Sequence, residues 1–298
     1  MRRLFITAMW LAACLPLATS VCATPEWSQP QKPFKLYGNA WYVGSKGLSA
    51  VLITSPQGHV LIDGTLPGNR ALIEANIRAL GFRVKDIRVI LSSHAHGDHA
   101  GAIAALAQDS GAVVRASVAG ARALEAGGKD PDDPQFGSID GYPPVPHVEP
   151  VRDGETVKLG PLAITAHYTP GHTPGGTSWT WRSCEGQHCL DMVYADSLSA
   201  ISRDGFRFSD QPQRVAAFRR SIATVAGLPC DLLVTPHPDA IDLLARAARR
   251  EQGAQPDPLI DRNGCHAYAE GAAQRLDQRL HEEQTPAPAH PEAAKAKS

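Results

Sequence analysis

The sequence predicts an α+β protein in which two β-sheets pack face to face with helices on their outer sides. Short apolar segments that alternate like strands are followed by segments with helical spacing. This order of strands and then helices occurs twice along the chain, as expected for layered sheets with covering helices. No linker separates the two halves, so we predict a single domain over residues 24–283 of the 298.

The first half begins with short strands and turns between residues 34 and 64. Strands are expected at 40–43, 49–53 and 60–63, with a Pro-Gln-Gly-His turn at 56–59. Residues 69–80 have helical spacing, and Gly81 follows as a stop signal. The remaining elements of this half are a strand at 87–91, a helix at 100–107, a strand at 113–117 and a helix at 118–126.

The second half follows a long segment, residues 128–150, that is rich in Pro, Asp and Gly. Loops of this length inside a compact domain are usually functional. Strands are then expected within 157–168, 178–194 and 232–235, and helices at 213–226, 240–250 and 267–283. Trp179 and Trp181 alternate along one of these strands and are expected to pack in the core.

Both ends of the chain are expected to lie outside the fold. Residues 1–23 carry two arginines, an apolar stretch too short to span a membrane and a small-x-small cleavage pattern at Val21-Cys22-Ala23, which predicts a removable signal peptide. A lipoprotein box at Leu11-Ala12-Ala13-Cys14 is a minor alternative. Residues 284–298 predict a disordered tail. We therefore expect export to the periplasm, with no membrane attachment after cleavage.

Charge and cysteine content are consistent with a secreted protein that does not bind nucleic acid. With 29 basic and 30 acidic residues and no block of like charge, nucleic acid is not expected as a partner. The mature chain keeps four cysteines, an even set suited to an oxidising compartment. Three pairings are possible, and we favour Cys184 with Cys189 and Cys230 with Cys265, the second closing a loop worth about 3–4 kcal/mol. A cysteine zinc site is the weaker alternative.

Residues 94–99 read His-Ala-His-Gly-Asp-His and place four metal-binding side chains in six positions. Imidazole nitrogens and carboxylate oxygens bind Zn²⁺ at about 2.0–2.2 Å. Because close neighbours point in different directions, we predict two ions, His94 and His96 binding one and Asp98 and His99 the other. Gly97 is expected to keep this loop tight, since a larger residue would crowd the cluster.

Each of these two ions needs a further histidine, and two candidates follow buried-looking strands. His172 lies in a Thr-Pro-Gly-His-Thr-Pro-Gly-Gly segment, and His237 lies in Thr-Pro-His-Pro. His167 follows the strand pattern and is expected to be an ordinary residue of the strand.

Together these segments resemble the metallo-β-lactamase superfamily. The shared order is His-x-His-x-Asp-His, then Pro-Gly-His-Thr-Pro-Gly, then a strand ending in Ala-Asp, then Thr-Pro-His. The segment 171–185 and Tyr194-Ala195-Asp196-Ser197-Leu198-Ser199 are similar, more narrowly, to subclass B3 and especially to AIM-type carbapenemases. The resemblance covers about residues 27–283, and it implies a four-layer αβ/βα sandwich of two mixed β-sheets flanked by helices.

The resemblance also implies a site and an activity. His94, His96 and His172 would bind the first zinc ion, and Asp98, His99 and His237 the second. Two zinc ions about 3.5–4 Å apart generate hydroxide near neutral pH, which would hydrolyse the amide bond of penicillins, cephalosporins and carbapenems and so confer resistance. Asp98 would also be catalytic, by orienting the nucleophile and helping to move its proton. Ser197 and Ser199 would bind the substrate carboxylate.

Several alternatives stay open. Gln135 and Phe136 in the long loop would line the substrate groove or only pack at the surface. Asp196 is expected to cap a turn or helix; a metal-bridging Asp196 would shift the chemistry toward lactones, thioesters or phosphodiesters. A non-catalytic zinc-binding protein is discounted because no ligand is missing. The oligomeric state is not determined by the sequence, although a monomer is favoured.

Overall fold

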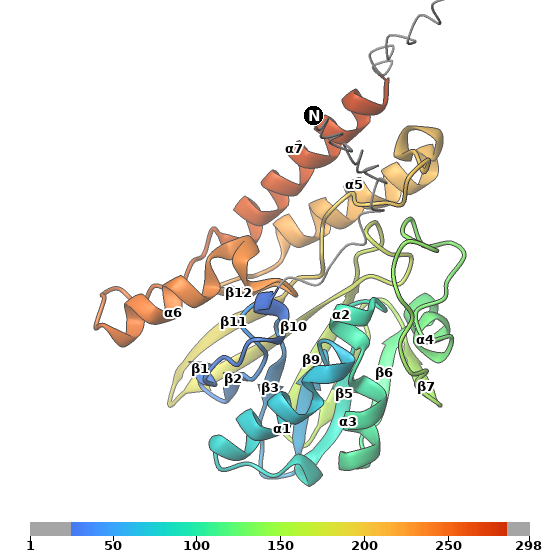
Figure 1. Ribbon diagram of the computed structural model, residues 1–298. Coiled ribbons are helices and arrows are strands. Elements are labelled where there is room, and N and C mark those ends of the chain that lie inside the picture. Colours follow the sequence, from blue (N-terminus) through green and yellow to red (C-terminus); the bar gives the residue numbers. More distant parts are fainter. Residues whose placement is uncertain (1–24, 285–298) are drawn as a thin grey trace, which may run out of the picture.

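The computed structural model describes residues 25–284 (Figure 1). The expected signal peptide lies outside the described residues. The expected tail does too, except for Gln284, which is the last residue of the final helix. Among residues 25–284, no helix is both long enough and apolar enough to cross a membrane.

Strands from the first half of the chain form a seven-stranded mixed sheet in the order β1 to β7. Its strands are β1 (Phe34–Tyr37), β2 (Ala40–Tyr42), β3 (Val51–Ile53), β4 (His59–Ile62), β5 (Ile87–Leu91), β6 (Val113–Ser117) and β7 (Val148–Val151). The first four strands pair antiparallel, and β4 to β7 pair parallel. Parallel neighbours need crossover connections, and helices supply them here.

Strands from the second half form a five-stranded mixed sheet in the order β12-β11-β10-β9-β8. They are β8 (Thr156–Leu159), β9 (Leu162–Tyr168), β10 (Thr177–Glu185), β11 (His188–Tyr194) and β12 (Leu232–Val234). Only β11 and β12 pair parallel. Both sheets are therefore mixed, as the resemblance implied.

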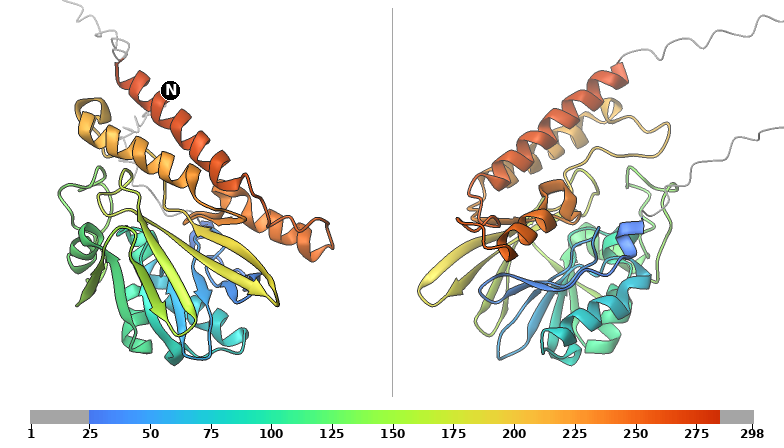
Figure 2. Two further views of the ribbon diagram at one scale, coloured as in Figure 1. Left: turned by 180° about the vertical axis from the view of Figure 1, so that it is seen from behind. Right: turned by 60° about the vertical axis from the view of Figure 1, so that its left-hand side comes forward.

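Seven α-helices and five short 3-10 helices occur in residues 25–284. The α-helices are α1 (Arg70–Ala79), α2 (Gly97–Ala100), α3 (Ile103–Ser110), α4 (Val118–Glu125), α5 (Pro212–Gly227), α6 (Leu243–Glu251) and α7 (Gly264–Gln284). The 3-10 helices are Pro25–Ser28, Pro67–Asn69, Val84–Asp86, Phe208–Asp210 and Pro238–Ile241. In Figures 1 and 2, α5 and α7 lie along one side of the sheets, and α1 and α3 lie on the opposite side.

Three hydrophobic cores hold these layers together. The central core joins the two sheets, with Ile62 and Leu91 from the first and Trp179 and Val234 from the second. A second core packs α1, α3 and α4 on the outer face of the first sheet, and a third packs α5 and α7 on the outer face of the second. Three cores between four layers confirm the predicted sandwich. Trp179 and Trp181 are buried, as predicted.

The structure differs from the predicted elements at two places near the site. The single helix expected at residues 100–107 is divided into α2 and α3, because Gly101 packs against Pro67: a Cβ on Gly101 would lie 2.3 Å from Pro67 Cδ. The segment expected to be only loop, residues 128–150, ends in strand β7. The parallel pairing of β7 with β6 cannot be recognised from local composition, since Glu149 and Pro150 are unusual in a strand.

Both favoured cysteine pairings are present. Cys184 and Cys189 are opposite each other in the β10–β11 hairpin and form a disulfide bond. Cys230 and Cys265 form the second bond, which fastens the first turn of α7 to the segment before β12.

Candidate metal centre

The candidate site lies at one edge of both sheets. Residues 94–99 follow β5, His172 follows β9, Asp196 follows β11 and His237 follows β12. Each segment leaves its strand at the carboxyl end. In the second sheet β9, β11 and β12 run in the same direction, because β10 pairs antiparallel with both β9 and β11, so their carboxyl ends lie at the same edge. Asp98 and His99 lie in the four-residue helix α2, so they are at the start of a helical segment as predicted.

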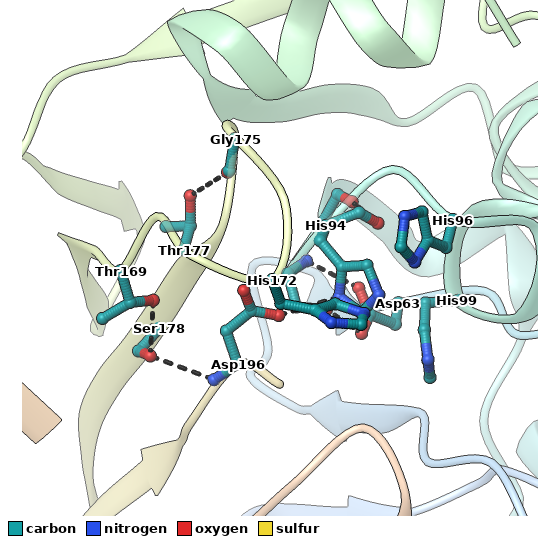
Figure 3. Close-up of polar contacts among 12 residues, drawn as sticks. Asp63, His94, His96, His99, Thr169, His172, Gly175, Thr177, Ser178 and Asp196 are labelled. Carbon is teal, nitrogen blue, oxygen red and sulfur yellow. Dashed lines mark hydrogen bonds and ion pairs between the residues drawn. The ribbon is translucent and has the colours of Figure 1, made fainter. Parts of the chain in front are cut away.

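Three histidines gather at the first position. Ligand atoms of His94, His96 and His172 lie within 4.8 Å of one another, and all three side chains are buried. Their ring centroids are 4.8–4.9 Å apart. Figure 3 shows the rings of His94, His96 and His172 around a common space.

Asp98 and His99 form a second group with His94, again with ligand atoms within 4.8 Å. His237 adjoins this group: its Nε2 lies 3.1 Å from His99 Nε2 and 3.4 Å from Asp98 Oδ2. The sequence-predicted ligands therefore come together from three separate segments of the chain. The indole of Trp27, near the described N-terminal end, lies 5.4 Å from the ring of His237 and covers it on one side.

Each histidine of the first group has a fixed partner on one ring nitrogen. His94 Nδ1 is 2.8 Å from Asp196 Oδ1, and His96 Nε2 is 2.9 Å from Asp133 Oδ2. His172 Nδ1 lies 3.0 Å from both the carbonyl and the hydroxyl oxygen of Ser199. An acceptor on one nitrogen keeps the proton there and leaves the other nitrogen as a lone pair for a metal.

The free nitrogens left by these partners suit a metal ion. His94 Nε2 is completely buried and has no hydrogen-bond partner among the described residues. A buried polar atom without a partner is costly unless something else binds it. Neutral imidazole with an open lone pair is the form that binds zinc, so the donor set fits the ion that the sequence implied.

Electrostatics favour the ligating form of these side chains. Burial, together with the neighbouring histidines, lowers the pKa of His94 and brings that of His172 to about 3. Burial also lowers the pKa of His99. For Asp98, burial alone would raise the pKa, but His99 and His237 hold it well below its ordinary value. At neutral pH His94, His99 and His172 are therefore neutral, and Asp98 is ionised.

Asp196 has a role that the sequence analysis did not consider. Its carboxylate is fully buried and accepts from the Nδ1 side of His94, away from the free Nε2. It therefore orients a histidine, instead of bridging two metals or capping a helix. The backbone N–H of Asp196 donates to Ser178 Oγ, which fixes the segment (Figure 3).

The residues predicted to bind substrate have different surroundings. Ser197 and Ser199 line a cavity of about 190 Å³ that His237 also borders. Gln135 is half-buried in the long loop; its backbone N–H donates to Asp133 Oδ1 at 2.7 Å, and its side chain forms no hydrogen bond among the described residues. The expectation for Gly97 is wrong: a Cβ there would meet no atom closer than 3.5 Å, which is an ordinary contact.

The sequence analysis missed the residues behind the cluster. Asp63 accepts hydrogen bonds from Ser93 N–H, Ser93 Oγ and Tyr194 Oη, at 2.6–2.8 Å, and so holds the loop that carries His94. Asp133 lies in the long loop and supports His96. The only sequence signal for Asp63 was an acidic residue at the end of an apolar strand, and Asp133 had none beyond its unusually long loop.

Comparisons with known proteins agree with this geometry. The family described as Metallo-beta-lactamase superfamily matches residues 46–260. The structure of Rm3 metallo-beta-lactamase is 50% identical, with a TM-score of 0.85, over 90% of this chain and 100% of that one. MEM-A1, a subclass B3 metallo-beta-lactamase from a soil metagenome library, is 50% identical with a TM-score of 0.83, over 86% and 98%.

Curated relatives are more distant. Ribonuclease TTHA0252 of Thermus thermophilus is 29% identical over 164 residues, which are 49% of this chain. The chain spans only 36% to 50% of the length of the curated relatives that it matches. The match to the family over most of the chain, and the half-identical structures that it covers almost completely, lead to one assignment. The chain belongs to the metallo-beta-lactamase superfamily and, within it, to subclass B3.

Proposed function

We propose that this protein hydrolyses the cyclic amide bond of β-lactam antibiotics, with two zinc ions as cofactors. His94, His96 and His172 would hold one ion, and Asp98, His99 and His237 the other. The observation that carries the proposal is the convergence of histidine nitrogens that no protein group occupies, backed by Asp196, Asp133 and Ser199. A site of histidine nitrogens and one ionised carboxylate that holds zinc is suited to activating water.

The bound zinc ions would supply an acidified water and would polarise the lactam carbonyl. The protein residues set up the rest of the reaction. Asp98 is ionised at neutral pH, so its carboxylate can accept a hydrogen bond from the attacking water, orient it and help to move its proton. Ser197 and Ser199 border the same cavity as His237, where their hydroxyl groups can donate to the substrate carboxylate. Gln135 is proposed to contact the substrate from the long loop.

Hydrolysis of lactones, thioesters or phosphodiesters is the alternative on this fold. We retain this alternative because one distant relative is named as a ribonuclease. The position of Asp196 opposes it, because its Oδ1 bonds His94 Nδ1 and Asp196 belongs to neither of the two ligand groups. We therefore favour the lactam.

We further propose that the protein acts in the periplasm on small molecules, and that it thereby confers antibiotic resistance. The two disulfide bonds suit an oxidising compartment. The sequence has 29 basic and 30 acidic residues, a balance that does not favour binding to nucleic acid.

The test is hydrolysis of a chromogenic cephalosporin and a carbapenem by the purified mature protein. We expect turnover that EDTA abolishes and Zn²⁺ restores, with two zinc ions per chain by elemental analysis. His172→Ala and Asp98→Ala are each expected to lower kcat/KM by a factor of 10³ or more, on the order of 4 kcal/mol in transition-state stabilisation.

His167→Ala is the matched control. His167 is on the strand that leads to His172, and within residues 25–284 its side chain hydrogen-bonds Thr180 and no metal ligand. This variant should retain nearly full activity. Turnover that persists in strong chelator, or in His172→Ala, would overturn the proposal. Hydrolysis of a lactone or phosphodiester in preference to both antibiotics would support the alternative.

A further inference from the structure

The cavity of about 190 Å³ next to His237 has one wall that none of the site assignments uses. The loop walls are Ser197, Leu198 and Ser199 on one side and Thr235 to His237 on another. Helix α7 closes the cavity with Tyr268 and Arg275. These two residues are two helical turns apart and so lie on the same face of α7.

Tyr268 fixes the position of this face relative to the site. Its hydroxyl accepts from the Leu198 N–H and donates to the Asp196 carbonyl, both at 3.1 Å. Helix α7 is thereby attached to the segment that carries Ser197 and Ser199. The Cys230–Cys265 bond fastens the first turn of the same helix. The Arg275 side chain therefore projects from a rigid support.

The guanidinium of Arg275 is directed back along the helix toward the site. A Cβ on Gly271 would lie 3.1 Å from Arg275 Nη1, so the side chain lies over this glycine, one turn nearer to Tyr268. Its charge also acts on Tyr268: burial raises the pKa of that hydroxyl well above its ordinary value, and the Arg275 charge partly opposes the increase.

Arg275 is a cation without a protein partner. Among residues 25–284, its side chain forms no hydrogen bond and has no carboxylate within ion-pairing distance. Arg279, one turn further along, bonds Glu283 at 2.6 Å instead. None of the described residues that line the cavity is acidic. The cavity thus combines a free guanidinium, two serine hydroxyl groups and a border with His237, a set that suits a carboxylate.

We propose that Arg275 binds the carboxylate of the substrate opposite Ser197 and Ser199, and so gives the enzyme its preference for anionic substrates. Penicillins, cephalosporins and carbapenems all carry a carboxylate beside the ring nitrogen, so one cation at this wall serves all three classes. The inference rests on the proposed function and adds a specificity-determining residue to it. Arg275 acts on binding, because it lies on the cavity wall and outside the metal ligand groups.

The experiment compares Arg275→Gln with the wild-type, zinc-loaded enzyme on a chromogenic cephalosporin and on the methyl ester of the same compound. For the free acid we expect KM to rise about tenfold with kcat within twofold, as for a lost charge-assisted hydrogen bond. For the ester the two proteins should not differ. Arg275→Lys should recover part of the loss, and added salt should weaken the wild type more than Arg275→Gln.

Arg249→Gln is the control, because Arg249 is an exposed arginine of α6 outside the cavity. Calorimetric binding of both compounds to chelator-treated protein gives a readout without turnover, with the acid expected to bind Arg275→Gln about tenfold more weakly. Equal kinetic constants for Arg275→Gln and wild type, or an equal loss of kcat/KM on the acid and the ester, would overturn the role of Arg275 but leave the proposed function intact. Wild-type enzyme that hydrolyses neither compound would overturn the proposed function, and the inference with it.

Discussion

At the residue scale, the metal-binding side chains are predictable from sequence and their supporting partners are not. Four ligands are adjacent in the chain, and His172 and His237 follow strands in loops braced by Pro and Gly. Asp133, in contrast, lies far along the chain from His96, and only the tertiary fold places its carboxylate 2.9 Å from that ring. Supporting residues of this kind are identified by their contacts in the folded protein, and a single sequence does not show which residues are in contact.

Asp133 offers a test of this supporting role. Asp133→Asn replaces a charged acceptor by an amide and weakens the preference for a proton on His96 Nε2. We expect zinc affinity to fall about 10- to 100-fold, as for other residues that orient metal ligands. Competition with a chromophoric chelator measures it.

Asp132→Asn is the control for that experiment, since the neighbouring carboxylate is exposed and forms no side-chain hydrogen bond among the described residues. Unchanged zinc affinity in Asp133→Asn, or an equal loss in both variants, would show that Asp133 does not orient His96.

His172 makes the stability of the metal-free protein depend on pH. Its pKa is about 3 in the folded state, chiefly through burial, and near 6.5 when unfolded. As pH falls below 6.5, His172 binds a proton in the unfolded chain but not in the folded chain. The free energy of unfolding therefore decreases with falling pH, down to about pH 3. Relative to His172→Gln, chelator-treated wild type should lose about 2 kcal/mol between pH 7 and pH 5, measured by urea unfolding. Parallel pH curves for the two proteins would contradict this.

At the element scale, strands and helices with strong periodicity are predictable and their interruptions are not. Strands β5 and β6 begin and end at the predicted residues. The division between α2 and α3 depends on Pro67, which approaches Gly101 from a distant turn. Likewise β7 is a strand because β6 offers it a parallel edge, although its own residues favour a loop.

The two disulfide bonds are expected to stabilise their elements unequally. The Cys230–Cys265 bond closes a loop with a sequence separation of 35, against 5 for Cys184–Cys189. In the chain-entropy model the longer loop is worth about 4 kcal/mol and the shorter about 2 kcal/mol. Denaturant unfolding of the two double Cys→Ala variants measures the difference. A larger loss from the hairpin bond would contradict loop length as the cause, and would point to strand pairing instead.

At the scale of the whole molecule, the site is built by both sheets together. The segment 94–99 follows the first sheet, while His172 and His237 follow the second. The fold class was predictable because the alternation of strands and helices is local. That the two sheets meet at one edge was predictable only from the family resemblance, because no local sequence pattern indicates it.

Zinc is therefore expected to stabilise the whole molecule. An ion bound only by the folded state at a hundred times its Kd adds about 2.7 kcal/mol to the free energy of unfolding. We expect wild type to show this gain over chelator-treated protein, and His237→Ala to lose much of it. His188→Ala, at the exposed tip of the β10–β11 hairpin, should behave as wild type. A gain that is the same in all three proteins would mean that His237 does not contribute to binding.

The division of the ligands between the two sheets determines when an ion is acquired. A chain exported through a membrane in unfolded form would carry no complete binding set, because residues 94 and 237 meet only after both halves have collapsed. The identity of the bound metal would then depend on the ion concentrations in the compartment where the protein completes folding, and not on those in the compartment where it is synthesised.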